Sequence, residues 1–338
     1  MPDLLEVENL AVELRTGRRY RPVLRDVSFA LGRGEVVALV GESGSGKSMT
    51  ARAIMGLLPP DGRQSGAIRF NGEDLGTKSK GEMREFRSKK AGMIFQDPRA
   101  AINPVHRVGD FLTEVLVRER GMDRREATNR AEALAEEVGI DDPRRRLRQY
   151  PHQLSGGMLQ RVMIASVLLA EPELLLADEP TTALDMTTQA DVVAVLDDLR
   201  RARGMAMMFI THDLELAAAF SDRIAVMYAG YIVEISTPAL LRDRPLHPYT
   251  SGLLASRPDL RERTRRVPQI PGRPRSAAEA PSGCPFNDRC PYVQPRCRDE
   301  VPPVREINGN FARCVRTDEL RVDTGQGVFG PDVRSGTD

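Results

Sequence analysis

Four short and almost wholly apolar runs divide the chain, at residues 35–40, 91–95, 174–177 and 205–210. Runs of this length, bounded by polar or turn residues, are typical of strands that are buried on both faces. Strands of a parallel sheet have this property, because helices cover the sheet on both sides. We therefore expect a parallel sheet at the centre of the fold.

A second kind of strand is indicated where apolar and polar residues alternate, at residues 4–14 and 23–31. A period of two is typical of strands with one buried face, as in antiparallel sheets. Residues 66–70 form a further expected strand, and residues 223–235 an expected hairpin that turns at 229–230. The N-terminal part is thus predicted to be an antiparallel β layer that precedes the central sheet.

Helical patterns occupy three stretches between the expected strands. Residues 49–58 have helical character and stop before a pair of prolines, and a new helix begins at Leu154 and runs to about Leu169. The intervening region, 108–149, is a charged helical segment in which 127–138 is the clearest helix. Such a charged surface is typical of a solvated helical region and not of a catalytic centre.

Bulk composition narrows the class of protein. A chain of 338 residues suits one large or two moderate domains, and its net charge of +1 gives no argument for a nucleic-acid partner. The sequence has no apolar run as long as the roughly 18 residues of a membrane span, and its first residues lack a signal-peptide core. We expect a soluble, cytoplasmic protein whose membrane role, if any, comes through partners.

The clearest chemical motif is GESGSGKS at residues 41–48, which has the P-loop pattern between an expected strand and an expected helix. Glycines 44 and 46 let backbone N–H groups surround phosphates, Lys47 supplies a positive charge, and the Ser48 hydroxyl is suited to Mg²⁺. An ordinary glycine turn before a helix is the alternative. The expected nucleotide contacts are Gly41, Ser43, Gly44, Ser45, Gly46, Lys47, Ser48 and Met49.

Polar side chains follow three of the expected parallel strands. They therefore lie at the carboxyl edge of the sheet, where open parallel sheets bind their ligands. Asp178 and Glu179 follow one strand, and we assign them a Mg²⁺ contact and the general base that polarises water. Gln96 is a candidate to touch Mg²⁺ or the attacking water, or equally a strand cap. His212 follows a third strand, which favours a catalytic role over the usual structural one.

Two further positions are candidate ligand contacts. Ser155, Gly156 and Gly157 open an expected helix and would form a second anion site, with a simple helix N-cap as the alternative. Tyr20, between the first two expected strands, would stack on adenine or be an ordinary surface tyrosine.

All four cysteines lie near the C-terminus, beyond a proline- and arginine-rich stretch at 258–281 that is typical of a linker. Without an export signal, disulfides are disfavoured, and four thiolates match a Cys₄ zinc site or a [4Fe–4S] cluster. The spacing C-x₅-C-x₆-C-x₁₆-C lacks the close pair of common zinc sites and so favours iron–sulfur, with zinc or unligated thiols as alternatives. The residues concerned are Cys284, Cys290, Cys297 and Cys314.

In their order along the chain these motifs resemble the ATP-binding cassette of ABC transporters, and in detail the dipeptide/oligopeptide/nickel branch of bacterial importers. The resemblance covers roughly residues 4–315. The stretches that carry it are GESGSGKS, FQDPRAAINP at 95–104, YPHQLSGGMLQRVMIA at 150–165, ADEPTTALD at 177–185 with its Ala183-Leu184-Asp185 end, FITHDLELAAAFSDRIAVMYAGYIVE at 209–234, HPYTSGLL at 247–254 and IPGRP at 270–274.

The resemblance implies an α/β P-loop NTPase fold. It has a RecA-like parallel sheet, an antiparallel β layer and an α-helical subdomain, followed by a small cysteine-rich C-terminal extension. We place the cassette at 1–255, with its helical subdomain at about 97–155, and the extension at 256–315. Residues 316–338 have little apolar content, and we expect them to be a disordered tail.

The resemblance also implies an activity and its cofactors. Two cassettes would dimerise head to tail and hydrolyse ATP with Mg²⁺. Residues 155–157 of each chain would contact the ATP of the other. Some peptide-importer cassettes that resemble this one hold a [4Fe–4S] cluster in the extension. The residues expected to act on the ATP of their own chain are Lys47, Ser48, Gln96, Asp178, Glu179 and His212.

The implied assembly lies at the cytoplasmic face of the bacterial inner membrane. The partners would be a second, usually different, cassette, two membrane permeases and an extracytoplasmic substrate-binding protein, and the helical subdomain would dock the permease. Dipeptides or oligopeptides are the expected solutes, with nickel as an alternative within the branch. A soluble ABC protein of translation or DNA repair is the rival class, but such proteins usually carry two cassettes or a long coiled-coil insertion, which this sequence lacks.

Overall fold

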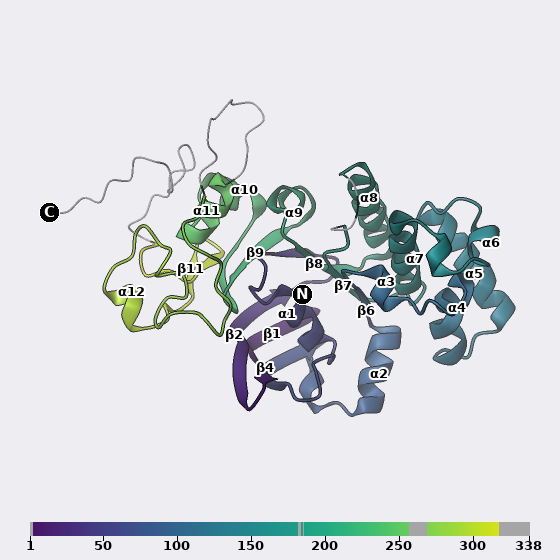
Figure 1. The fold of residues 1–338 in the computed structure, drawn as a ribbon, viewed down its shortest axis with the longest axis horizontal. Coiled ribbons are helices and arrows are strands. Elements are labelled where there is room, and N and C mark those ends of the chain that lie inside the picture. The colour runs from purple at the N-terminus through teal and green to yellow at the C-terminus, as the bar shows by residue number, and fades with distance from the viewer. Residues whose placement is uncertain (1–2, 182–183, 185, 257–268, 318–338) are drawn as a thin grey trace.

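The computed structural model describes residues 3–181, 184, 186–256 and 269–317. Its centre is a set of parallel strands in the order β6-β7-β8-β3, namely β6 (Ala91–Ile94), β7 (Leu174–Asp178), β8 (Ala206–Thr211) and β3 (Val36–Val40) (Figure 1). Every residue of these four strands is buried. The prediction of a central parallel sheet from short apolar runs is therefore confirmed.

The sheet continues on the other side of β3 through a hairpin. Strand β9 (Arg223–Tyr228) pairs with β3 in parallel, and β10 (Tyr231–Ser236) returns antiparallel to β9, as predicted. Beyond β10 the order passes to β2, at the pair Tyr231 and Asp26. This junction attaches the N-terminal strands to the central sheet.

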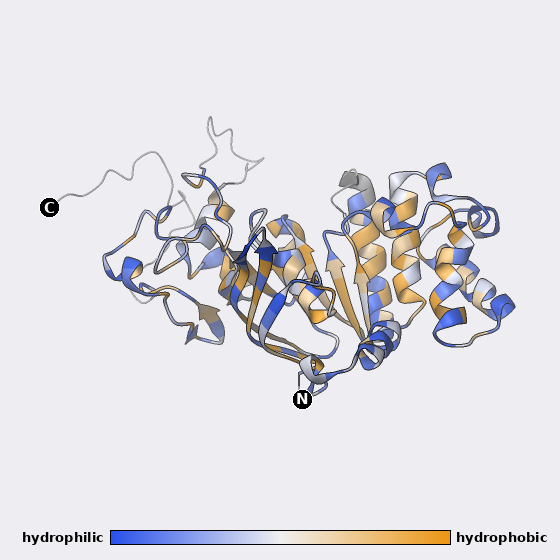
Figure 2. Ribbon diagram, turned by 60° about the horizontal axis from the view of Figure 1, so that its bottom comes forward, coloured by the Kyte–Doolittle hydropathy of each residue, from blue (hydrophilic) through white to orange (hydrophobic). Residues whose placement is uncertain are grey.

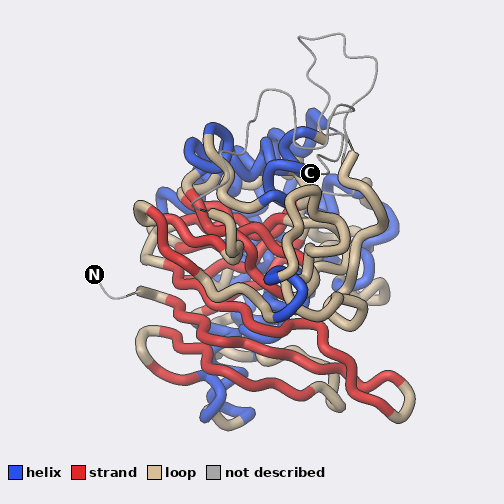
Figure 3. Tube along the Cα trace, turned by 90° about the vertical axis from the view of Figure 1, so that its left-hand side faces the viewer, coloured by secondary structure: helices blue, strands red, loops and turns tan. Residues whose placement is uncertain are grey.

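The predicted antiparallel layer is present and its first two strands are longer than the sequence pattern indicated. It consists of β1 (Leu5–Thr16), β2 (Arg19–Leu31), β4 (Arg63–Phe70) and the short β5 (Glu73–Asp74). In Figure 3 these strands run below the central sheet. Their apolar side chains and those of β3, β7 and β8 form one hydrophobic cluster, so the two layers share a core.

The helical region lies to one side of the central sheet (Figure 1). The charged helical segment predicted at 108–149 contains three helices, α4 (Val108–Arg118), α5 (Arg124–Glu137) and α6 (Pro143–Arg146). It breaks at Gly121, with φ of 65°, after α4, and at Gly139, with φ of 78°, after α5. Apolar side chains of α4, α5 and α7 (Gly156–Leu168) pack together in one hydrophobic cluster. Hydrophobic residues, orange in Figure 2, alternate with hydrophilic ones along these helices.

Helix α1 (Lys47–Ile54) follows the motif at 41–48 and ends sooner than predicted. Gly56, with φ of 62°, terminates it in the left-handed conformation usual after a helix. The other helices are η1 (Leu75–Thr77), α2 (Lys80–Lys89), α3 (Pro98–Ala101), η2 (Pro151–Gln153), α8 (Met186–Arg203), α9 (Leu214–Phe220), α10 (Pro238–Asp243) and α11 (Pro248–Ala255).

The C-terminal segment, residues 269–317, is mostly loop with α12 (Arg296–Asp299), β11 (Arg305–Ile307) and β12 (Asn310–Ala312). Strand β12 pairs antiparallel with β10, so the segment extends the sheet and is not a separate body. Figure 3 shows its loops packed in front of the sheet. Much of the linker predicted at 258–281 and most of the predicted tail lie outside the described residues. Among the described helices, none is long and apolar enough to cross a membrane.

Candidate functional site

The loop at 41–48 joins β3 to α1, and its backbone requires glycine at two positions. Gly41 has φ of 154°, and a Cβ there would lie 2.1 Å from the Met227 carbonyl oxygen. Gly46 has φ of 114°, and a Cβ would lie 2.6 Å from a methyl group of Leu24. Gly44, with φ of 79°, faces open space. The loop is therefore held close to β2 and β9 while its tip stays accessible.

Lys47 is buried, with its ammonium group inside this loop. Its Nζ donates to the Gly41 carbonyl at 2.8 Å and to the Glu42 carbonyl at 3.2 Å. Burial lowers the pKa of Lys47, although the carboxylates of Glu179, Asp178 and Glu42 oppose that shift. A buried ammonium whose direct partners are neutral carbonyls suits an incoming polyanion.

Two hydroxyl groups, of Ser48 and Ser45, and the carboxylate of Asp178 lie beside the lysine. Ser48 Oγ donates to Asp178 Oδ1 at 2.8 Å, although 130 residues separate them in the sequence. Burial raises the pKa of Asp178, and the hydrogen bond from Ser48 opposes this. The buried Ser45 Oγ has no hydrogen-bond partner among the described residues. This set of oxygens beside a P-loop fits a Mg²⁺–phosphate ligand.

The predicted strand-end residues meet at Glu179. Its carboxylate accepts a hydrogen bond from Gln96 Nε2 at 3.0 Å and lies 3.7 Å from His212 Nδ1. The side chain of Glu179 is 15% exposed, whereas that of His212 is 63% exposed. The parallel sheet thus brings together residues that follow β6, β7 and β8 and that the sequence places far apart.

Residues 155–157 stand at the start of α7, and the hydrogen bonds described for Ser155 stay within that turn. Ser155 Oγ accepts from the Met158 N–H at 3.3 Å, which is the N-cap that the sequence offered as an alternative. Ser155 is exposed, and a Cβ on Gly156 would meet nothing within 4 Å. The helix start is therefore open to a ligand or to another chain.

Tyr20 lies at the start of β2, and one face of its ring is covered. The Arg63 guanidinium carbon lies 3.6 Å from the ring centroid. Adenine stacking at Tyr20 stays a prediction. Of the motif at 183–185, Ala183 and Asp185 lie outside the described residues.

Sequence reasoning missed that the C-terminal part of the chain contacts the P-loop. The Glu42 N–H donates to Tyr249 Oη at 2.9 Å, and the Glu42 carboxylate forms an ion pair with Arg289 at 2.7 Å. Glu42 occupies a position that the P-loop pattern leaves free, so the motif carries no signal for this contact. Tyr249 belongs to the stretch HPYTSGLL, which marked a family resemblance without indicating a role.

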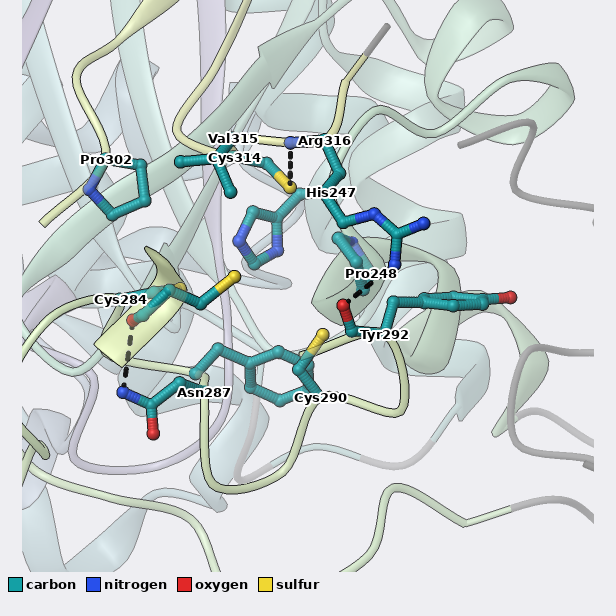
Figure 4. Close-up of a pocket in the computed structure, with 12 residues that line it drawn as sticks. His247, Pro248, Cys284, Asn287, Cys290, Tyr292, Pro302, Cys314, Val315 and Arg316 are labelled. Atoms are coloured by element: carbon teal, nitrogen blue, oxygen red, sulfur yellow. Dashed lines mark hydrogen bonds between the residues drawn. The ribbon is translucent and has the colours of Figure 1, made fainter. Parts of the chain in front are cut away.

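The four cysteines are free thiols and line one small pocket with His247 and Phe286 (Figure 4). Each sulfur accepts a backbone hydrogen bond. The donors are Phe286 for Cys284, Tyr292 for Cys290, Gln294 for Cys297 and Arg316 for Cys314.

Burial raises the pKa of Cys284 and of Cys290 to about 12, and the neighbouring cysteines add to the shift. Within the described residues, no group of three or more His, Cys, Asp or Glu side chains is placed to hold a metal ion. The iron–sulfur cluster expected from the sequence is therefore not confirmed.

Comparison with known proteins agrees with this geometry. Residues 24–182 match the ABC transporter family model, and residues 233–297 match the model of the oligopeptide/dipeptide transporter C-terminal region. The oligopeptide transport ATP-binding protein OppD of Salmonella typhimurium is 42% identical over 314 residues, which are 93% of either chain. The dipeptide transport ATP-binding protein DppD of Bacillus subtilis is 45% identical over 312 residues, 92% of this chain and 93% of the relative.

A solved structure supports the fold. The dimeric ATP-binding cassette MJ0796, in a post-hydrolysis state with ADP and Pi, is 28% identical with a TM-score of 0.63, over 69% of this chain and 98% of that one. The site and the comparisons lead to one conclusion. The chain belongs to the ABC transporter family and is an ABC ATPase with the C-terminal region of oligopeptide/dipeptide transporters.

Proposed function

We propose that this protein hydrolyses ATP to drive the import of peptides through a membrane ABC transporter. The observation that carries the proposal is that Gln96 and His212 both contact Glu179. They lie beside Lys47 and the hydrogen-bonded pair Ser48 and Asp178. ATP-binding proteins named for oligopeptide and dipeptide transport share more than 40% identity with nearly the whole chain, which favours peptides as the solute.

We assign the residues of the site the following roles. The backbone of residues 41–48 and the Lys47 ammonium bind the phosphates of ATP. Ser48 and Asp178, with Gln96, would hold Mg²⁺, which would neutralise charge on the phosphates. Glu179 accepts a proton from the attacking water.

His212 and Gln96 position the Glu179 carboxylate through the contacts described above. The nucleotide contacts also include Met49 at the start of α1, and Tyr20 for adenine.

The opening of α7 completes the site of a second cassette. Ser155, Gly156 and Gly157 are backbone donors at the N-terminus of a helix of 13 residues, which suits a phosphate. In one chain this end is open, so we place the second ATP across a head-to-tail dimer. The dimeric form of the related MJ0796 cassette supports this arrangement.

The helical subdomain, at about 97–155 within a cassette of residues 1–255, is the surface for the permeases. A groove of about 490 Å³ runs along α4. It is bordered by charged and apolar side chains, and Val105 nearby is 73% exposed. We infer that a loop of one of the two membrane permeases occupies it at the cytoplasmic face, with an extracytoplasmic protein delivering the peptide. The groove is lined by Asn103, His106, Asp110, Phe111, Thr113, Glu114, Val117, Arg118 and Arg124.

We assign the C-terminal extension a [4Fe–4S] cluster held by its four cysteines. The spacing of the cysteines along the chain lacks the close pair of common zinc sites, which favours the cluster. Four sulfurs around one pocket, each accepting a peptide N–H, fit such a group, since hydrogen bonds to sulfur stabilise and tune it. The cluster would supply structural cross-linking to this part of the chain.

Reconstitution tests the proposed activity. The chain is combined with the permeases and partner cassette of its transporter and placed in vesicles with the substrate-binding protein. We expect ATP-dependent uptake of a labelled dipeptide. The variant Lys47→Ala should lose both this uptake and ATP hydrolysis. Uptake of Ni²⁺ but of no di- or oligopeptide would contradict the solute assignment, and ATP hydrolysis unaffected by Lys47→Ala would contradict the site.

A further inference from the structure

The cysteine-bearing segment places one buried cation directly on the P-loop. Arg289 Nη1 lies 2.7 Å from Glu42 Oε2, and its Nη2 lies 3.2 Å from Oε1, which is the geometry of a bidentate pair. The Arg289 side chain is 3% exposed and that of Glu42 is 23% exposed. The two residues are 247 positions apart in the sequence, so the contact exists only in the folded chain.

Several groups fix the Arg289 side chain. Its Nε donates to the Pro271 carbonyl at 2.8 Å and its Nη1 to Tyr228 Oη at 3.4 Å. The guanidinium also lies 5.6 Å from the Tyr228 ring centroid and 5.8 Å from that of Phe286. Burial opposes its charge, but the hydrogen bonds to Glu42 and Tyr228 outweigh this and raise the pKa of Arg289. The guanidinium is therefore a fixed positive charge at this point.

Glu42 is held on both its backbone and its side chain. Its N–H donates to Tyr249 Oη at 2.9 Å, and its carbonyl accepts from Lys47 Nζ at 3.2 Å. Its carboxylate contributes to the electrostatics of Lys47. A carboxylate this close to a phosphate-binding lysine would repel the triphosphate unless another charge neutralised it.

We propose that Arg289 is a positioning residue of the nucleotide site, which neutralises Glu42 and holds the P-loop ready for ATP. The inference rests on the proposed assignment of residues 41–48 to the phosphates. It makes the affinity for ATP depend on the C-terminal segment, which the P-loop motif does not contain. Because Arg289 directly precedes Cys290, an ordered cysteine loop is required to present the guanidinium.

A rescue experiment in the full-length protein tests this inference. The dissociation constant for a fluorescent ATP analogue is measured by titration for each variant, with the melting temperature recorded in parallel. Arg289→Ala should weaken binding by about tenfold, since it leaves a negative charge beside the phosphates. Adding Glu42→Gln to that variant should restore binding to within about twofold of wild type, because the repelling charge is gone. A purely structural role for Arg289 would instead appear as a fall in melting temperature that accompanies the loss of binding.

Matched variants make the outcome decisive. Arg275 pairs with Asp288 in the same segment at 2.8 Å, in an ion pair that does not include Glu42, and Arg275→Ala should leave ATP binding unchanged. If Arg289→Ala does not fold, Arg289→Gln keeps donor groups without the charge and should show the same weakening and rescue. Wild-type binding in the Arg289 variants, or a loss that Glu42→Gln does not restore, would overturn the inference.

A further variant separates the inference from the assignment on which it rests. Lys47→Ala should abolish binding of the same ATP analogue. If it binds normally, the phosphate assignment itself fails. If Lys47→Ala abolishes binding while Arg289→Ala has no effect, only the role of Arg289 is wrong.

Discussion

Glu179 has a backbone conformation that non-glycine residues rarely adopt, with φ of 46°. Such a conformation costs about 1–3 kcal/mol and persists where surrounding contacts determine it. Here the Glu179 N–H donates to the Ile210 carbonyl at 3.0 Å, and the carboxylate is directed to Gln96 and His212. The strain is thus located at the one carboxylate to which we assign the proton transfer.

Replacing this carboxylate tests its role. Glu179→Gln should lower ATP turnover by about 100-fold or more, because the amide cannot accept the proton of water. Binding of ATP should persist, since the P-loop is untouched, and the closed dimer should accumulate. Turnover is measured by phosphate release and dimerisation by light scattering with ATP present. Turnover equal to that of wild type would show that another group is the base.

A second prediction concerns the backbone of the P-loop. Gly41→Ala should destabilise the protein by more than the roughly 1–3 kcal/mol of a strained φ, because its Cβ would also overlap the Met227 carbonyl. Gly17 is the matched control, since its φ is 63° and a Cβ there would meet nothing within 4 Å. Urea unfolding of both alanine variants measures the difference. Equal losses would mean that the loop moves away from β9 without cost.

Among the helices, α7 has a start that its own chain leaves open. The Ser155 side chain caps the helix, yet Ser155 is exposed and Gly156 faces empty space. In the same helix Leu159, Val162 and Met163 are buried in the helical core. A rigid, well-packed helix with an open N-terminus is suited to contact a ligand held by another subunit.

A negative charge at this helix start should block the composite site. Gly156→Asp should reduce turnover by about tenfold or more, because the carboxylate would repel the partner's ATP. Nucleotide binding to the P-loop of the same chain should be unchanged. Gly81→Asp, in the first turn of α2, is a control that should leave both properties unaltered. Full activity of Gly156→Asp, or of the monomer at high dilution, would contradict a site formed by two chains.

The C-terminal segment joins the fold at several places. Strand β12 extends the sheet at β10, and Arg313 pairs with Asp26 on β2 at 2.7 Å. Tyr228, Tyr249 and Phe286 pack together, with ring centroids 4.7 to 5.3 Å apart, between the cassette and the cysteine loop. The segment is thus anchored to the cassette while its cysteine loop stays poor in regular structure.

A metal group would stabilise this loop, because ligand binding energy contributes to folding. Protein purified without oxygen should be brown and contain about four irons per chain. Cys290→Ser should remove the colour and make residues 281–315 sensitive to protease. Colourless protein with one zinc, or with no metal and four titratable thiols, would show that the cluster assignment is wrong.

Local patterns predicted much of this fold. The strands of the central sheet were expected from runs of apolar residues, because a short apolar run indicates a strand that is buried on both faces. The P-loop was expected because its hydrogen-bond donors are contiguous in the sequence. Four polar residues were expected at the site because each follows a buried strand, namely Asp178, Glu179, Gln96 and His212. The early end of α1 at Gly56 and the division of 108–149 were missed, since they depend on turn conformations that a hydrophobic pattern does not specify.

Other features exist only because the chain is folded. The distance of 3.0 Å between Gln96 and Glu179 depends on the order of parallel strands, which the sequence does not state. The pair Glu42 and Arg289 joins a position that the P-loop motif leaves free to a loop 247 residues away. The sequence therefore specifies which chemical groups the protein carries, whereas the packing of distant segments decides which of these groups come into contact. The reason is that contact energies depend on distance in space and not on separation along the chain.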